Sequence, residues 1–153
     1  MSLQPIIQIN KLRIQANNKT LLYIESLCCN VGEIHSIIGE SGSGKSLTLL
    51  TIIGLLPENL VASGEVLLWH NNGFVDLLKL SNKEFQAFRG KCIGMVFQEP
   101  MSALNPQMTC GKQLLESFFV HGTKNEAIKV IAEKLDKVGL GQMVGREIGR
   151  AHV

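Results

Sequence analysis

Alternating apolar and polar positions predict strand structure at the start of the chain. The apolar positions of the first stretch are Ile7, Ile9, Leu12 and Ile14. Their alternation with polar side chains is typical of a half-buried strand. Residues 17–19 predict a turn, and residues 20–29 predict a second strand rich in leucine and isoleucine. We therefore expect two antiparallel strands at the start of the fold.

The next pattern is a mostly apolar run at residues 34–38, followed by a glycine-rich loop at residues 39–44 and an apolar segment from Lys45 onward. The run predicts a buried strand, and the segment after the loop predicts a helix. That helix should end before Pro57, because proline removes a backbone donor and disfavours helix at the residue before it. The predicted order is strand, loop, helix.

Further strands and a helix are predicted between the loop and residue 97. The strand candidates are residues 65–69, a short apolar stretch at residues 74–80 and a buried strand at residues 93–97. The hairpin signal Asn-Asn-Gly at residues 71–73 closes the first of them. Ser81 and Glu84 form a capping box, so a helix bearing Phe85 should start there and end at residues 89–90.

Two more helices are predicted near the end of the chain. Thr109 is placed to cap a helix that runs to about residue 120 and carries a broad apolar face. Thr123 and Glu126 form a second capping box, and apolar positions at helical spacing lead from there to Gly139, a natural stop.

Composition and charge narrow the class of protein. The 153 residues amount to one domain or a piece of one, and 45% hydrophobic content is enough for a packed core. Fifteen basic and 13 acidic residues give a formal net charge of +2 without long runs of either sign. This balance argues against a protein that binds nucleic acid or a membrane surface.

Cysteine spacing and hydropathy exclude further classes. Cys28, Cys29, Cys92 and Cys110 form no C-x-x-C pair, so we expect reduced core thiols in a cytosolic setting and no metal bound by them. The apolar region at residues 47–56 is too short to span a bilayer. The first five residues lack the basic and apolar blocks of a secretion signal. Any link to a membrane is therefore expected to come through a partner.

The glycine-rich loop carries the clearest chemistry. Its residues are Gly39, Glu40, Ser41, Gly42, Ser43, Gly44, Lys45 and Ser46. Glycines let successive backbone N–H groups turn inward as a nest for phosphate oxygens, and the following helix adds its positive end. Lys45 would reach the β- and γ-phosphates, and the hydroxyl of Ser46 would complete the ligand shell of Mg²⁺. The alternative is a glycine-rich turn that fits the pattern by chance.

Gln98 stands at the carboxyl end of the strand predicted at residues 93–97. In open α/β sheets ligands collect outside the carboxyl ends of strands, the edge that also carries the glycine loop. The side chain could take a Mg²⁺ position, directly or through water, or orient an attacking water. The alternative is a solvated glutamine at a strand end. A proline-bounded loop follows at residues 99–106 and otherwise reads as a rigid surface connection.

With these residues in view, the chain resembles the ATP-binding subunit of ABC transporters, in the branch that imports oligopeptides, dipeptides or nickel. The resemblance covers about residues 6–140. It rests on the Walker A loop at residues 39–46, the Q-loop glutamine Gln98, the Arg-Gly pair at residues 89–90 and the run Met-Val-Phe-Gln-Glu-Pro-Met-Ser-Ala-Leu-Asn-Pro at residues 95–106. That last run is far more specific than the glycine loop alone.

The resemblance implies an α/β fold of the P-loop NTPase class. The chain would be a truncated ABC-type nucleotide-binding domain, with an N-terminal antiparallel β layer, a mainly parallel core sheet and an incomplete helical subdomain. Residues 1–140 would form the N-terminal part of that domain, and residues 141–153 a divergent tail. The full-length protein would be a transport ATPase that binds ATP and Mg²⁺ and powers the import of peptides or similar small solutes.

Roles for individual residues follow from the same resemblance. ATP would contact the stretch from Gly39 to Leu47, Mg²⁺ would be held by Ser46 and Gln98, and the catalytic residues in this chain would be Lys45 and Gln98. Residues 98–106 would contact the transmembrane permease subunits. A second ATP-binding subunit or domain would complete a dimer at the cytoplasmic face of the cell membrane. A periplasmic or extracellular solute-binding protein would take part indirectly, and nucleic acid would not.

Some features of the family pattern are missing from this chain. Near the expected adenine-stacking position stands Ala16, and Tyr23, the single tyrosine, lies in a strand pattern and is expected in the core. Leu47 stands where many relatives have threonine, which we count as neutral. The signature loop, an apolar strand ending in Asp-Glu and a switch histidine do not occur after residue 140. These parts supply the catalytic base, so this chain alone is expected to be inactive.

Two alternatives stay open. One is an ATPase of DNA repair or chromosome maintenance with the same fold, although residues 46–98 are compact and the charge is nearly balanced. The other is a non-catalytic fragment that binds nucleotide. The transported substrate is not readable from the chain.

The last seven residues, 147–153, match neither the family nor a structural pattern. One reverse translation, GAG ATC GGA AGA GCA CAC GTC, resembles a widely used sequencing adapter. We expect a truncation artefact from about residue 147, and a natural short tail is the alternative. A genuine stop codon after Val153, with codons unlike the adapter, would exclude the artefact.

Overall fold

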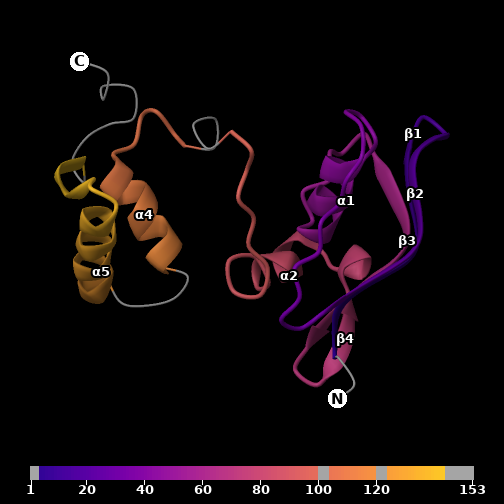
Figure 1. The fold of residues 1–153 in the computed structure, drawn as a ribbon, viewed down its shortest axis with the longest axis horizontal. Coiled ribbons are helices and arrows are strands. Elements are labelled where there is room, and N and C mark those ends of the chain that lie inside the picture. The colour runs from indigo at the N-terminus through magenta and orange to yellow at the C-terminus, as the bar shows by residue number, and fades with distance from the viewer. Residues whose placement is uncertain (1–3, 100–103, 120–123, 144–153) are drawn as a thin grey trace. The chain divides into compact units, whose positions relative to one another are not determined.

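A computed structural model describes residues 4–99, 104–119 and 124–143. The chain divides into two compact units, Met1–Arg89 and Gly90–Val153, and each is described by itself (Figure 1). Of the divergent tail predicted at residues 141–153, residues 144–153 lie outside the described residues, and so does the truncation artefact expected from about residue 147.

The first unit is built on a four-stranded antiparallel sheet. Its strands are β1 (Pro5–Ala16), β2 (Lys19–Asn30), β3 (Val61–His70) and β4 (Gly73–Asp76), in the order β2-β1-β3-β4. Figure 1 shows the three long strands lying alongside one another. The two N-terminal strands and the hairpin at residues 71–73 are therefore confirmed. The short apolar stretch at residues 74–80 supplies most of β4 and a 3-10 turn, η1 (Leu77–Lys79).

A bulge in β1 explains an irregular feature of its apolar pattern. Ile9 and Leu12 are both fully buried although they stand three positions apart, whereas strict alternation would place them on opposite faces. The pairing of β1 with β3 shifts between Asn10 and Arg13, and Lys11 has a φ of 49°. The extra residue resets the alternation. Gly64 faces the bulge, where a Cβ would lie 2.4 Å from the carbonyl oxygen of Lys11.

The helix after the glycine loop is α1 (Lys45–Ile52). It ends in a Schellman motif, in which the N–H of Leu55 donates to the carbonyl of Leu50 at 2.8 Å and the N–H of Gly54 donates to that of Thr51 at 3.1 Å. The predicted end before Pro57 is confirmed.

The predicted capping box is also present. Helix α2 (Asn82–Gln86) follows Ser81, whose hydroxyl accepts from the N–H of Glu84 at 3.3 Å while the Glu84 carboxylate accepts from the N–H of Ser81 at 2.8 Å. Phe85 on this helix is buried at 3% exposure.

Two predicted buried strands are wrong for this structure. Residues 34–38 and 93–97 are not extended strands, and Ile34, Ile38 and Val96 are 98%, 92% and 93% exposed. Parallel strands need pairing partners and cover on both faces. Within residues 4–99, 104–119 and 124–143, strand pairing occurs only in the antiparallel sheet. The predicted parallel core sheet is thus not formed, whereas the antiparallel β layer is.

The expectation that the four cysteines are core thiols is wrong. Cys28 and Cys92 are exposed and the other two are half-buried, so none is a core thiol.

The second unit contains α4 (Cys110–Phe119), α5 (Lys124–Lys137) and a 3-10 turn, η2 (Gly141–Met143). The cap at Thr109 is confirmed, since its hydroxyl accepts from the N–H of Lys112 at 3.4 Å. Helix α5 stops as predicted, because the N–H of Gly139 donates to the carbonyl of Asp136 at 2.9 Å. The capping box predicted from Thr123 lies outside the described residues. Across the part of the chain that the structure describes, every helix is too short or too polar to cross a bilayer.

Candidate functional site

The glycine loop leads directly into the first turn of α1. Gly42 and Gly44 have φ values of 80° and 91°, a conformation that other residues resist. Gly44 is the N-cap of α1, and this helix has neither a side-chain cap nor an acidic residue in its first turn. The first N–H groups of a helix carry partial positive charge and lack partners within the helix. This end of α1 is therefore suited to an external anion.

Lys45 folds back over the loop. Its ammonium nitrogen Nζ lies 2.7 Å from the carbonyl oxygen of Gly39, 2.6 Å from that of Glu40 and 3.3 Å from Oγ of Ser43. The N–H of Ser43 also donates to the carbonyl of Glu40 at 3.2 Å, which closes a turn. The loop thus curls around a single positive charge.

Strand β2 supports this loop from one side. A Cβ at Gly44 would lie 2.8 Å from Cδ1 of Leu22, so any larger residue there would press on that side chain. On α1, the buried positions are Thr48 and Thr51. The hydroxyl of Thr48 donates to the carbonyl of Gly44 at 3.1 Å, which ties the loop to the helix. Packing therefore fixes the side of the loop that faces β2 and α1, while its other side faces solvent.

The remaining loop residues lie at the surface. Glu40, Ser41 and Ser46 are exposed, and Leu47 is half-buried. The hydroxyl group of Ser46 is accessible on the first turn of α1, where a cation bound to phosphate oxygens would need it. The structure brings together every loop residue that the sequence singled out.

Gln98 is exposed and belongs to the second unit. Its place beside the glycine loop and its role beside a nucleotide stay predictions. Of the loop that follows it, residues 100–103 lie outside the described residues. Gln113 on α4 holds the end of that loop: its amide accepts from the N–H of Asn105 at 2.8 Å and donates to the Asn105 carbonyl at 2.9 Å. Sequence reasoning missed Gln113, because nothing in the pattern of α4 marks it.

The expectation that Tyr23 belongs to the core is wrong. Its side chain is 46% exposed, with the guanidinium of Arg13 5.3 Å from the ring centroid. The hydroxyl donates to Glu25, and this hydrogen bond raises the pKa of Tyr23. Neighbouring residues of a strand face opposite sides, and Leu22 faces the glycine loop. Tyr23 therefore points away from the loop, and the adenine-stacking residue stays unassigned.

Arg89 makes contacts that sequence reasoning did not predict. Its Nε donates to the carbonyl of Ile53 at 2.9 Å, and Nη2 donates to that of Gly54. The guanidinium also lies 4.9 Å from the ring centroid of Phe85. The sequence marked Arg89 only as part of a family motif. A side chain reaching 36 positions back along the chain leaves no local pattern.

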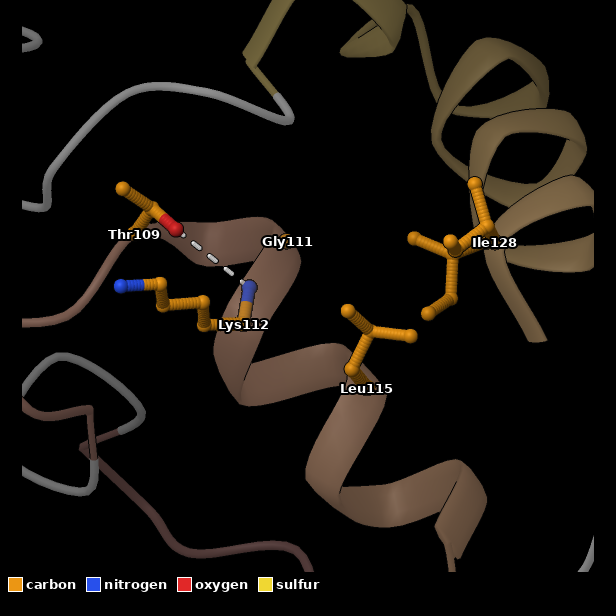
Figure 2. Close-up of a pocket in the computed structure, with 6 residues that line it drawn as sticks. Thr109, Gly111, Lys112, Leu115 and Ile128 are labelled. Atoms are coloured by element: carbon orange, nitrogen blue, oxygen red, sulfur yellow. Dashed lines mark hydrogen bonds between the residues drawn. The ribbon is translucent and has the colours of Figure 1, made fainter. Parts of the chain in front are cut away.

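A separate cavity lies between α4 and α5 in the second unit. Its volume is about 260 Å³, and its lining is largely apolar; the lining residues are Thr109, Gly111, Lys112, Leu115, Ile128 and Ile131. Figure 2 shows Leu115 and Ile128 pointing toward one another across it, with the bond from Lys112 to Thr109 at one end. A lining that is largely apolar does not suit a phosphate group. The glycine loop is therefore the better candidate site.

Comparison with known proteins gives the chain its family. The sequence model of a family described as "ABC transporter" matches residues 24–151. A Brucella ovis protein named "Putative peptide import ATP-binding protein" is 40% identical over 149 residues, which cover 92% of this chain and 44% of the relative. The oligopeptide transport ATP-binding protein OppD of Bacillus subtilis is 46% identical over 113 residues, covering 71% of this chain and 30% of OppD.

A third relative is also a transport ATP-binding protein by name. The dipeptide transport ATP-binding protein DppD of Bacillus subtilis is 43% identical over 113 residues, which cover 71% of this chain and 32% of DppD. The chain thus spans less than half the length of each of these curated relatives. From the family match across most of its length, we conclude that the chain belongs to the ABC transporter family.

Proposed function

We propose that this chain is the nucleotide-binding part of a transport ATPase, which binds ATP with Mg²⁺ and, in the complete protein, uses its hydrolysis to import peptides or similar small solutes. The observation that carries the proposal is the ammonium of Lys45 held within the glycine loop at the uncapped start of α1. The names of the relatives support the transport role, and none of the three reported names describes an ATPase of DNA maintenance.

The loop fits a polyphosphate in geometry and in charge. Backbone N–H groups from Gly42 to Ser46 would surround the phosphate oxygens, as the start of a helix does for anions generally. The ammonium group has three donors, and its acceptors are now Gly39, Glu40 and Ser43. Phosphate oxygens would replace some of these neutral acceptors. A phosphate oxygen carries negative charge, so Coulomb attraction to the ammonium adds to the hydrogen bond, and the exchange favours binding.

The donor set also fits Mg²⁺. This ion prefers oxygen ligands and commonly keeps waters and substrate phosphates among them. Ser46 would supply one hydroxyl oxygen, and Gln98 would supply an amide oxygen or orient a water. When bound, the ion would neutralise phosphate charge.

Partners follow from the same role. The permease subunits would contact residues 98–106, and a second ATP-binding subunit or domain would pair with this one. The protein would then work at the cytoplasmic face of the cell membrane, and a solute-binding protein would deliver the peptide to the permease.

Titration with a fluorescent ATP analogue tests the proposal. Lys45→Ala should weaken binding at least about tenfold, because a charge-assisted contact is worth roughly 1.5–3 kcal/mol. Lys83→Ala is the matched control, since that lysine is exposed on α2 away from the loop. Equal affinity of wild type and Lys45→Ala, with both proteins folded, would exclude the loop as the nucleotide site.

A further inference from the structure

The C-terminal end of α1 is held by hydrogen bonds, whereas its N-terminal end has no side-chain cap. The Schellman motif uses the carbonyls of Leu50 and Thr51. Two carbonyls just beyond these, those of Ile53 and Gly54, both accept from the single guanidinium of Arg89. A fork of two donors fixes direction as well as distance. Arg89 therefore determines the position of the C-terminal end of α1.

The position of Arg89 is itself fixed by packing. Its guanidinium lies 4.9 Å from the ring centroid of Phe85, and the ring is buried. A Cβ on Gly54 would lie 2.6 Å from Cε2 of that ring, so ring and backbone are in direct contact. The turn that ends α1 is thus held by contact with Phe85 of α2 and by two hydrogen bonds from Arg89, which follows α2.

We propose that Arg89 is a positioning residue for the nucleotide site, setting the placement of Lys45 and the loop N–H groups through α1. This inference rests on the proposed function. Helix α1 is only eight residues long, about 12 Å at 1.5 Å per residue. Because so short a helix moves as one piece, a shift of its C-terminal end also moves its N-terminal end. The positive charge also lies at the negative end of the helix dipole, where cations are favourable.

The test measures ATP affinity in the complete protein with a fluorescent ATP analogue, below the melting temperature of each variant. Arg89→Ala should weaken binding about tenfold or more, because small misplacements of binding groups can cost up to about a hundredfold in function. Arg89→Lys keeps the charge but loses the fork, so its affinity should fall between wild type and Arg89→Ala.

Arg13→Ala is the matched control. Arg13 also lies against an aromatic ring, that of Tyr23, on the sheet face away from the loop. Its loss should leave ATP affinity unchanged within about twofold, whatever it does to stability.

Lys45→Ala, measured alongside, separates the two proposals. If Lys45→Ala loses binding while Arg89→Ala lowers only the melting temperature, Arg89 is merely structural and this inference is overturned. If Lys45→Ala keeps full affinity for ATP, the proposed function itself is contradicted, and the inference about Arg89 falls with it. Should Arg89→Ala not fold, Arg89→Lys decides: wild-type affinity in that variant would overturn the inference.

Discussion

The ammonium nitrogen of Lys45 lies 2.6 Å from the carbonyl oxygen of Glu40, five residues before it. This bond places the one lysine of the loop at the centre of the curve formed by residues 39–44. Under the proposed function, the ammonium group would exchange these loop acceptors for phosphate oxygens when a nucleotide binds.

Gly44 should be the glycine of the loop that is most sensitive to substitution. It combines a φ of 91° with a Cβ position 2.8 Å from Leu22. Gly44→Ala should lower the free energy of unfolding by about 1–3 kcal/mol and weaken ATP binding, because the start of α1 must move. Urea unfolding and nucleotide titration measure both. Gly42→Ala is the comparison, since it carries similar backbone strain at a φ of 80° but its Cβ would meet nothing within 4 Å. A larger stability loss in Gly42→Ala than in Gly44→Ala would contradict the account.

Gly64→Ala should damage the sheet rather than the site. A Cβ there would lie 2.4 Å from the carbonyl oxygen of Lys11 and 2.8 Å from that of Asn10, and backbone cannot swing away as a side chain can. We expect the free energy of unfolding to fall by at least about 2 kcal/mol, in the range of strained backbone and overpacking effects. Chemical denaturation measures this loss, and a loss below about 0.5 kcal/mol, ordinary for surface changes, would refute the described bulge.

Replacing Asp76 and replacing its ion-pair partner Lys79 should lower the free energy of unfolding by very different amounts. Oδ1 of Asp76 accepts from the N–H groups of Val66 and Leu78 at 3.3 Å and 3.2 Å. Oδ2 lies 3.0 Å from Nζ of Lys79, as an ion pair without hydrogen-bond geometry. Asp76→Ala should lower the free energy of unfolding by about 1–3 kcal/mol, because it leaves two N–H groups without that acceptor.

Lys79→Ala is the matched variant. Its side chain is 76% exposed, and exposed ion pairs contribute roughly 0–1 kcal/mol. Thermal melts of both variants should therefore show a clear fall for Asp76→Ala and little for Lys79→Ala. The reverse order would mean that the ion pair, and not the backbone contacts, stabilises this corner.

The capping box at α2 should make stability depend on pH. Hydrogen bonds from the Ser81 hydroxyl and the Ser81 N–H lower the pKa of Glu84 below its ordinary value of 4.5. A carboxylate whose pKa falls on folding adds stability above the unfolded pKa, and this contribution is lost as pH falls through the folded value. The stability difference between wild type and Glu84→Gln should thus be largest near neutral pH and shrink below 4.5. Denaturant unfolding across that range measures it; a difference that does not change with pH would contradict the assignment.

Local signals in the sequence predicted much of the first unit correctly. Capping by Ser81 and Glu84, the hairpin at residues 71–73 and the helix after Gly44 each depend on neighbours within a few positions. The glycine loop is likewise a local motif, and the structure places its lysine inside the curve. These features need no distant partner, so the order of residues alone predicts them.

Features that depend on distant residues were missed or wrong. The predicted strands at residues 34–38 and 93–97 require pairing partners, and their apolar side chains such as Ile34 and Val96 are exposed. Tyr23 alternates as a core residue would, yet it lies on the outer face beneath Arg13. The reach of Arg89 to Ile53 spans 36 positions. In each case the outcome depends on which segments meet, which periodicity does not encode.

The central claim is that the backbone N–H groups at the start of α1, together with Lys45, hold the polyphosphate of ATP. Titrating isotope-labelled protein with MgATP and following its backbone amide resonances tests this most directly. The account predicts that the largest shifts fall on Gly42, Ser43, Gly44, Lys45 and Ser46, and that adenosine alone does not reproduce them. Shifts that spare these five amides while others move, or that adenosine matches in full, would contradict it.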